Sequence, residues 1–415
     1  MPSPRKLLSI GHSYVVALNR RLVNEIARLG KGEWEVTTVA PSFLHGDLRP
    51  MHLEVDPNEI CQLKAVPVYL SQRIHVMTYG WQLKQILQQG WDLVHCWEEP
   101  YILAGGQIAW WMPKETPLVY RTAQSRTSSY LDRFLPNRTP LVYFSFQSHS
   151  KLYPPPFDWI ERYSMSRASG WICSGHTVAE ALKPRPGYSL PMRLIPLGVD
   201  VNHFYPAPDA GLQIRRSLEW EEQGAPVIGY LGRLVPDKGL DLLMQVLDRL
   251  QTPWRALFVG TGPMEATLQA WANRHPDRVR ICTTVKHDEV PQYLNAMDIL
   301  CAPSQTMPHW REQFGRMLVE AFACGVPVVG SDSGEIPYVI QNAGVVVGEK
   351  DEQGWVEALS DLLDSPSRRE KLAAKGLQRA HSVYAWPVIA KQHLEFFTEL
   401  LDSPGKSNSL GGQGK

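Results

Sequence analysis

The sequence lacks paired cysteines and long apolar runs. Its six cysteines are scattered, with no Cys-x-x-Cys pair and no metal-ligand spacing, and most of them lie inside apolar runs. We therefore expect buried, reduced thiols and a cytoplasmic protein. No apolar segment approaches the roughly 20 residues that span a bilayer, so any membrane contact is expected to be peripheral, at the inner face.

The sequence also lacks an excess of charge of either sign. It has 42 basic and 42 acidic residues among 415, which gives a formal net charge of zero. A neutral chain has no general electrostatic attraction for nucleic acid, so we predict no nucleic-acid partner. It also has no Asp-x-Asp motif. We accordingly expect no metal site and no bound cofactor.

Short β-type runs alternate with helical patterns along the whole chain, which predicts an α/β fold of parallel sheets covered by helices on both faces. The predicted strands include 65–70, 93–96, 170–173, 227–231, 279–282 and 299–302. A chain of 415 residues exceeds what one core usually fills, so we expect two doubly wound domains that face each other. The predicted division is a first domain at 1–205, a linker at 206–226, a second domain at 227–384, a final helix at 385–402 that packs on either domain, and an unstructured tail at 403–415.

A buried strand at 227–231 is followed by Gly232, Arg233 and, five residues later, Lys238. In open α/β sheets, ligands bind beyond the carboxyl ends of the strands, next to helix N-termini. An Arg and a Lys at that place are suited to clamp a diphosphate, the Arg as a bidentate fork and the Lys as a point charge. Two cations on a solvated turn fit the spacing equally well.

A second candidate segment begins at Glu312 and continues through a helix expected at 315–324. Gly315 at the helix entrance leaves backbone N–H groups open to a phosphate or a sugar hydroxyl. Glu320 lies inside that otherwise apolar helix, where a carboxylate is costly without partners. A position on a solvated stripe is the alternative for Glu320, and its apolar neighbours disfavour it.

Two weaker signals lie elsewhere at predicted strand ends. Gly260 and Gly262 form a glycine-rich turn where backbone can approach a ligand, although a plain tight turn explains them as well. In the first half, His12 and His95 follow strands and Glu98 lies beyond one of them. A single such histidine is usually structural, and the grouping with carboxylates shifts our interpretation toward function.

Taken together, these segments resemble glycosyltransferase family 4, most closely over residues 227–348. The segment Gly232–Gly239 looks like the family's phosphate-binding stretch, and Glu312 with Glu320 matches its Glu-x7-Glu motif. The resemblance implies two facing Rossmann-like domains (the GT-B architecture) and a retaining, metal-independent transfer of a hexose-type sugar from a nucleotide-diphosphate donor. It implies a glycan, polysaccharide or lipid-linked acceptor.

The resemblance also implies roles for individual residues. Glu312 would meet the hydroxyls of the donor sugar and Glu320 the ribose, while Val285 would lie on the loop for the nucleotide base. The predicted catalytic residues are Glu312, Lys238, Arg233 and His95. The predicted donor-binding residues are Gly232, Arg233, Lys238, Gly260, Gly262, Val285, Glu312, Phe314, Gly315, Arg316 and Glu320.

The first half departs from the family pattern. Trp97 stands where many members have a second histidine, and Gly11-His12 replaces a Gly-Gly pair. The predicted acceptor-side residues are Gly11, His12, Trp97, Glu98 and Glu99.

Three other functions remain open at this stage. The same fold carries nucleotide-sugar epimerases and phosphorylases, and it also carries silent relatives that only bind a nucleotide-sugar or a glycan. A nicotinamide-dependent oxidoreductase is the third, but Gly11 supplies one glycine where the Gly-x-Gly-x-x-Gly fingerprint needs several.

Overall fold

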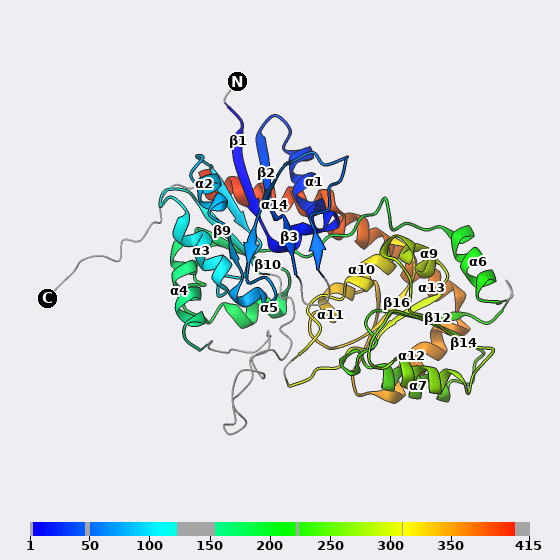
Figure 1. Cartoon of the computed structure of the whole chain (residues 1–415). Helices are drawn as coiled ribbons and strands as arrows, with labels where there is room; N and C mark the ends of the chain where they lie inside the picture. The colour runs from blue at the N-terminus through cyan, green and yellow to red at the C-terminus, as the bar shows by residue number, and fades with distance from the viewer. Residues whose placement is uncertain (1–2, 46–49, 123–153, 221–223, 309, 403–415) are drawn as a thin grey trace.

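The computed structural model describes residues 3–45, 50–122, 154–220, 224–308 and 310–402. Within them the chain forms two parallel sheets, one from each half of the sequence, with helices packed around both (Figure 1). The α/β class and the two facing Rossmann-like domains expected from the sequence are confirmed. The tail predicted to be unstructured, 403–415, lies outside the described residues.

The first sheet has seven strands in the order β11-β10-β9-β8-β1-β2-β5. Its pairings are parallel, and the central strands are buried along their length, as expected for a sheet covered on both faces. Two short antiparallel pairs, β3–β4 and β6–β7, lie outside it. The strands are β1 Arg5–Ile10, β2 Trp34–Pro41, β3 Phe43–Leu44, β4 Met51–His52, β5 Gln62–Val66, β6 Val68–Tyr69, β7 Thr78–Tyr79, β8 Leu93–Cys96, β9 Leu118–Thr122, β10 Gly170–Cys173 and β11 Met192–Leu194.

The helices of the first half lie between these strands along the chain. Short 3-10 turns at His12–Val15 and Ala17–Arg20 precede the first α-helix, and another lies at Ile74–Val76. The α-helices are α1 Arg21–Leu29, α2 Gln82–Leu87, α3 Leu103–Trp111, α4 Phe157–Arg167 and α5 His176–Leu182.

The second sheet has six strands in the order β14-β13-β12-β15-β16-β17, and it is parallel throughout its pairings. Its strands are β12 Val227–Leu231, β13 Arg255–Val259, β14 Val279–Cys282, β15 Ile299–Ala302, β16 Val328–Ser331 and β17 Gly344–Val347. The α-helices of this half are α6 Pro208–Ser217, α7 Leu240–Arg249, α8 Glu265–Ala272, α9 Val290–Asn295, α10 Arg316–Ala323, α11 Ile336–Ile340, α12 Glu352–Asp364, α13 Pro366–Arg379 and α14 Trp386–Asp402. The 3-10 turns Pro236–Lys238 and His287–Glu289 and the π-helical turn Ala380–Tyr384 complete it.

The predicted linker at 206–226 is wrong over much of its length, because it contains helix α6. We interpreted its prolines and glycines as loop signals, yet Pro208 occupies the first turn of the helix, where its missing N–H is not needed. Helix α6 packs on the second half: Gly211 lies against the Asn295 backbone, and Arg215 forms an ion pair of 2.8 Å with Asp298.

The chain crosses between the halves at two adjacent segments. The Val199 N–H donates to the Tyr384 carbonyl at 2.8 Å, and Val199 pairs with Ala385 in a parallel bridge. Beyond that bridge α14 returns to the first half and packs on α1, where Phe397 joins the core under the first sheet (Figure 1). None of the helices described in the structure is long and apolar enough to cross a bilayer.

Candidate active site

The candidate site lies at the carboxyl ends of adjacent parallel strands of the second sheet. Strand β12 lies between β13 and β15, so the loops that follow these strands meet at one edge. The backbones of two loops are in contact: a Cβ on Gly260 would lie 1.8 Å from the Gly232 carbonyl oxygen, and a Cβ on Gly262 would lie 2.3 Å from that of Leu234. Glycine is required at Gly260 and Gly262 because side chains there would collide with the neighbouring loop.

Lys238 and Glu312 form a buried ion pair at this edge. The Lys238 Nζ lies 2.5 Å from the Glu312 Oε2, and both side chains are about nine-tenths buried. The Ser304 hydroxyl, just beyond β15, donates to the same carboxylate oxygen at 2.9 Å. The Trp310 ring lies 4.5 Å from the ammonium. Lys238 and Glu312 were predicted from the sequence, whereas Ser304 and Trp310 were not.

Arg233 provides the second cation of the site. It follows β12 directly, and its carbonyl accepts a hydrogen bond of 2.6 Å from the Tyr230 hydroxyl. Its Nη1 is buried and has no hydrogen-bond partner among the described residues. A buried guanidinium nitrogen without a partner is costly, and an anionic ligand would satisfy it.

Helix α10 begins at Arg316, directly after Gly315, which has a left-handed φ of 77° that glycine adopts without strain. The first N–H groups of such a helix have no partner within the helix and suit an anion. Phe314 is buried and packs edge-on against Tyr384, while Val285 is partly buried against the same apolar cluster. Phe314 and Gly315 therefore lie at the entrance of α10, and Val285 packs on the same apolar cluster as Phe314.

Glu320 lies one turn into α10, and its side chain is buried. Burial raises the pKa of this carboxyl, and the Arg316 guanidinium, 3.9 Å away, acts to lower it. The predicted position on a buried face is confirmed, whereas the predicted contact with ribose stays a prediction. A buried carboxylate with one distant cation has unused capacity to accept hydrogen bonds from a ligand.

Among the predicted acceptor-side residues, Glu98 is fully buried and holds the loop that follows β1. Its carboxylate accepts from the His12 N–H at 2.6 Å and the Tyr79 hydroxyl at 2.5 Å, and its Oε2 lies 2.6 Å from the His12 Nδ1. Burial acts to raise the pKa of Glu98, but His12 and the hydrogen bonds outweigh it and hold the pKa below its ordinary value. A Cβ on Gly11 would lie 2.8 Å from the Trp97 Cβ, so the residues that follow β1 and β8 are also in contact.

His95 is not at the substrate-facing edge, which corrects its predicted catalytic role. It is completely buried, its Nδ1 lies 3.2 Å from the Ser9 hydroxyl, and its ring packs on Phe397 from α14. Burial, together with a smaller contribution from the charge of Arg121, lowers the pKa of His95 to about 3. His95 is a neutral core residue because the last helix of the chain covers it.

Glu99, the neighbour of Glu98, is in a different electrostatic state. Burial of its carboxyl raises its pKa to about 8, with Glu161 and Glu98 adding to the shift. Its Oε1 is buried without a hydrogen-bond partner among the residues that the structure describes. At neutral pH Glu99 is therefore largely protonated, whereas Glu98 is ionised.

Replacement of Glu98 by glutamine should destabilise the fold by about 3 kcal/mol, because it breaks a buried pair. We take the low end of the usual range since the His12 side chain is 20% exposed. The contribution of Glu98 is present above its unfolded pKa, about 4.3, and is lost as the pH falls through its lower folded pKa. Urea unfolding at several pH values measures both effects.

Glu25→Gln is the matched control, since Glu25 pairs with Arg28 on the exposed surface of α1. Such a surface pair is worth about 0–1 kcal/mol. Equal losses in the two variants, or a Glu98→Gln loss that persists unchanged at low pH, would contradict the buried-pair interpretation.

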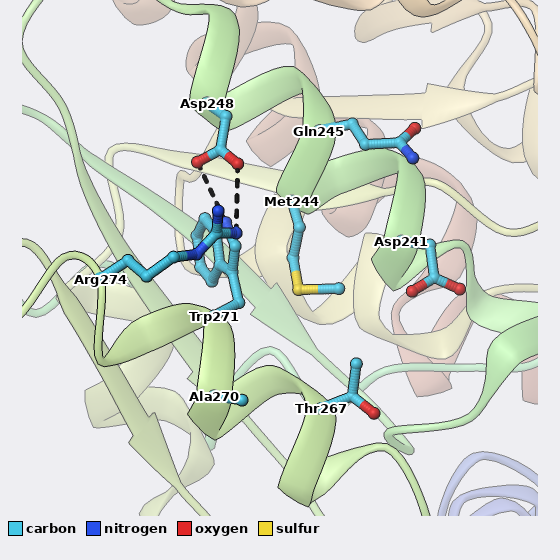
Figure 2. Close-up of a pocket in the computed structure, with 8 residues that line it drawn as sticks. All are labelled: Asp241, Met244, Gln245, Asp248, Thr267, Ala270, Trp271 and Arg274. Atoms are coloured by element: carbon cyan, nitrogen blue, oxygen red, sulfur yellow. Dashed lines mark hydrogen bonds and ion pairs between the residues drawn. The ribbon is translucent and has the colours of Figure 1, made fainter.

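A separate pocket lies between α7 and α8, away from the predicted residues (Figure 2). Asp248 accepts a hydrogen bond of 3.0 Å from the Trp271 Nε1 and lies 3.5 Å from Arg274. The Asp248 carboxylate thus links α7 to the α8 region. The pocket contains no residue of the candidate active site.

Two facing Rossmann-like units, with a cation-bearing site at the strand ends of the second, define the GT-B class of glycosyltransferases. Two family models match the chain: one described as Glycosyltransferase Family 4 over residues 17–203, and one described as Glycosyl transferases group 1 over residues 213–379. Together they include the whole second sheet and every strand of the first sheet except β1. The chain belongs to glycosyltransferase family 4.

Curated relatives match over part of their length. The chain is 32% identical over 205 residues to a GDP-mannose-dependent monoacylated alpha-(1-6)-phosphatidylinositol monomannoside mannosyltransferase of Corynebacterium glutamicum, a match that includes 48% of this chain and 54% of the relative. It is 29% identical over 252 residues to a D-inositol 3-phosphate glycosyltransferase of Xylanimonas cellulosilytica, with 58% and 59% included. The chain thus spans about half the length of the curated relatives it matches.

Solved structures are similar over nearly the whole chain. A glycosyltransferase from Rickettsia africae superposes with a TM-score of 0.71 at 13% identity, covering 97% of this chain and 100% of that one. Sucrose-phosphate synthase from Thermosynechococcus elongatus gives 0.68 at 18% identity, covering 96% and 100%. At these identities the likeness establishes the GT-B fold.

Proposed function

We propose that the protein transfers a hexose-type sugar from a nucleotide-diphosphate donor to a glycan, polysaccharide or lipid-linked acceptor, with retention of anomeric configuration. The observation that carries the proposal is the arrangement at the strand ends of the second sheet. There the loops that follow β12 and β15 carry the buried Lys238–Glu312 pair, the entrance of α10 and a buried Arg233 nitrogen that has no partner among the described residues.

The chemical step is departure of a nucleoside diphosphate from the anomeric carbon. Negative charge grows on the leaving phosphate while the sugar becomes oxocarbenium-like. Arg233 and Lys238 would stabilise the growing charge from fixed positions, together with the N–H groups at the start of α10. Glu312 would accept hydrogen bonds from the sugar hydroxyls and so orient the sugar.

We propose that this chemistry needs no metal ion and no cofactor. The two cations, Arg233 and Lys238, would supply the positive charge that a bound metal supplies in other transferases. In the described ranges, no group of three or more His, Cys, Asp or Glu side chains is arranged to hold a metal ion. Turnover that persists in EDTA is the expected result.

The names of the relatives suggest where to begin the search for substrates. Several are GDP-mannose-dependent transferases that act on phosphatidylinositol mannosides, and others act on inositol 3-phosphate. We propose GDP-mannose as the first donor to test and a lipid-linked or polyol-type acceptor, with a cytoplasmic protein in peripheral contact with the membrane.

Incubation of the protein with UDP-, GDP- and ADP-sugars in EDTA, with measurement of nucleoside diphosphate release, tests the proposal. We expect slow hydrolysis of one donor, and NMR of the sugar product shows whether the configuration is retained. Tight nucleotide binding without release from any donor would indicate an obligatory acceptor or a silent relative. The absence of any binding would refute the assignment of the site.

A further inference from the structure

Glu335 lies at the contact between the two halves of the molecule. It follows β16 in the second half, and its side chain is buried. Its carboxylate accepts hydrogen bonds from the first residues of α5 in the other half: from the His176 N–H at 2.7 Å, the Thr177 N–H at 2.9 Å and the Thr177 hydroxyl at 2.9 Å. One side chain thus satisfies three donors across the interface.

The backbone of the same loop supports Glu312. The Glu335 N–H donates to the Glu312 carbonyl at 2.9 Å. The preceding Gly334 has a φ of 57°, and a Cβ there would lie 1.9 Å from the same carbonyl oxygen. The backbone of Glu312 therefore rests directly on the loop that ends at Glu335.

Further contacts show that this interface is closely fitted. A Cβ on Gly175, immediately before α5, would lie 2.5 Å from the Glu335 Cδ. Beside it, the His176 ring stacks on the Tyr338 ring, with centroids 4.3 Å apart and an interplanar angle of 14°. The neighbouring Arg311 reaches the Thr177 carbonyl at 3.4 Å.

We infer that Glu335 is a positioning residue that couples the placement of the first half to the placement of Glu312. Its carboxylate holds α5, and its backbone holds the sugar-facing carboxylate. Glu312 is thus supported in this position when the two halves are in contact. This inference rests on the proposed function, since it assigns Glu335 a task in the transfer reaction without a contact to substrate.

Two substitutions test the contact from opposite sides. Glu335→Ala removes the acceptor, and Gly175→Ala forces a methyl group against the Glu335 carboxylate from the first half. Gly175 has an extended φ of −165°, which alanine adopts readily, so its effect is confined to this contact. We expect kcat to fall on the order of 10-fold to 100-fold in each variant, because misplaced reacting groups slow catalysis steeply.

Free-nucleotide affinity should stay within about twofold of the parent, because the diphosphate and ribose contacts all come from the second half. In the double variant, kcat should fall no further than in Glu335→Ala, since both changes break one contact. Fluorescence resonance energy transfer between two dyes, one attached to each half, should report a longer distance between the halves in both variants. Asp332→Asn is the control, because Asp332 is exposed and its Oδ1 accepts from the N–H of Glu349, a residue of the same half.

The outcomes separate this inference from the proposed function. If the parent protein neither binds nor hydrolyses any donor, the proposed function fails and the inference fails with it. If the parent is active and both variants keep their kcat, with only a lower melting temperature, Glu335 is merely structural and the inference is overturned. An equal loss of nucleotide affinity and kcat would also overturn it, because it would indicate local damage to the donor site.

Discussion

Replacement of Lys238 by methionine should reduce turnover of the donor on the order of 10²-fold or more. Methionine has an unbranched side chain of similar length, so the change removes the positive charge that lies over the Trp310 ring and keeps most of the side-chain volume. A preorganised cation that meets charge developing in the transition state is worth about 3–4 kcal/mol. Steady-state release of nucleoside diphosphate at saturating donor measures the effect.

The structure adds a condition to this prediction. Lys238 neutralises the buried Glu312, so its removal leaves a carboxylate with Ser304 as its remaining described partner. Thermal unfolding must therefore confirm that the variant is folded at the assay temperature. Lys391→Ala, at an exposed position on α14, is the control for the loss of one positive charge. A folded Lys238→Met variant with parental kcat would exclude the proposed role of the ammonium.

Replacement of Glu320 by alanine should weaken nucleotide binding by about 10-fold to 100-fold. A hydrogen bond to a charged group contributes about 1.5–3 kcal/mol, and the carboxylate is proposed to accept from the ribose hydroxyls. Glu312→Ala should instead reduce mainly the transfer step, because Glu312 faces the proposed sugar end of the donor. Isothermal titration of free nucleotide into each variant distinguishes the two positions.

The pKa of Glu320 provides a second measurement. Burial raises this pKa in the free protein, and hydrogen bonds from a bound ribose would favour the ionised carboxylate and lower it. Nucleotide binding should therefore release protons at pH values above the ordinary glutamate pKa of about 4.3, where the raised pKa keeps part of the carboxyl protonated in the free protein. Titrations in buffers of different ionisation enthalpy detect this release.

Glu320→Gln should abolish the proton release, while Glu357→Gln, at an exposed position on α12, should leave it unchanged. Unchanged nucleotide affinity in Glu320→Ala would exclude the ribose contact.

Much of the fold could be predicted because it depends on local patterns. Strands β8, β10, β12, β14 and β15 begin and end at the predicted residues, since each is a short apolar run bounded by turn residues. Predictions of element boundaries failed where proline is compatible with more than one local structure. Pro208 marks a helix start as readily as a loop, and α6 was missed for that reason. Beyond Val66, Pro67 ends β5, so the predicted strand at 65–70 divides into β5 and β6.

The candidate site was predictable in part. The sequence alone determined which residues could carry the chemistry, because cations after a buried strand and a carboxylate in an apolar helix need ligands or partners wherever the chain places them. Which of these residues meet depends on the three-dimensional fold. Lys238 and Glu312 are 74 residues apart and pair because β12 and β15 are neighbours in the sheet. His95 lost its predicted role because α14, about 300 residues later, covers it, and Glu335 gained one because α5 lies against it. Such contacts depend on how strands are ordered and how the two halves pack, and no local pattern of residues encodes that.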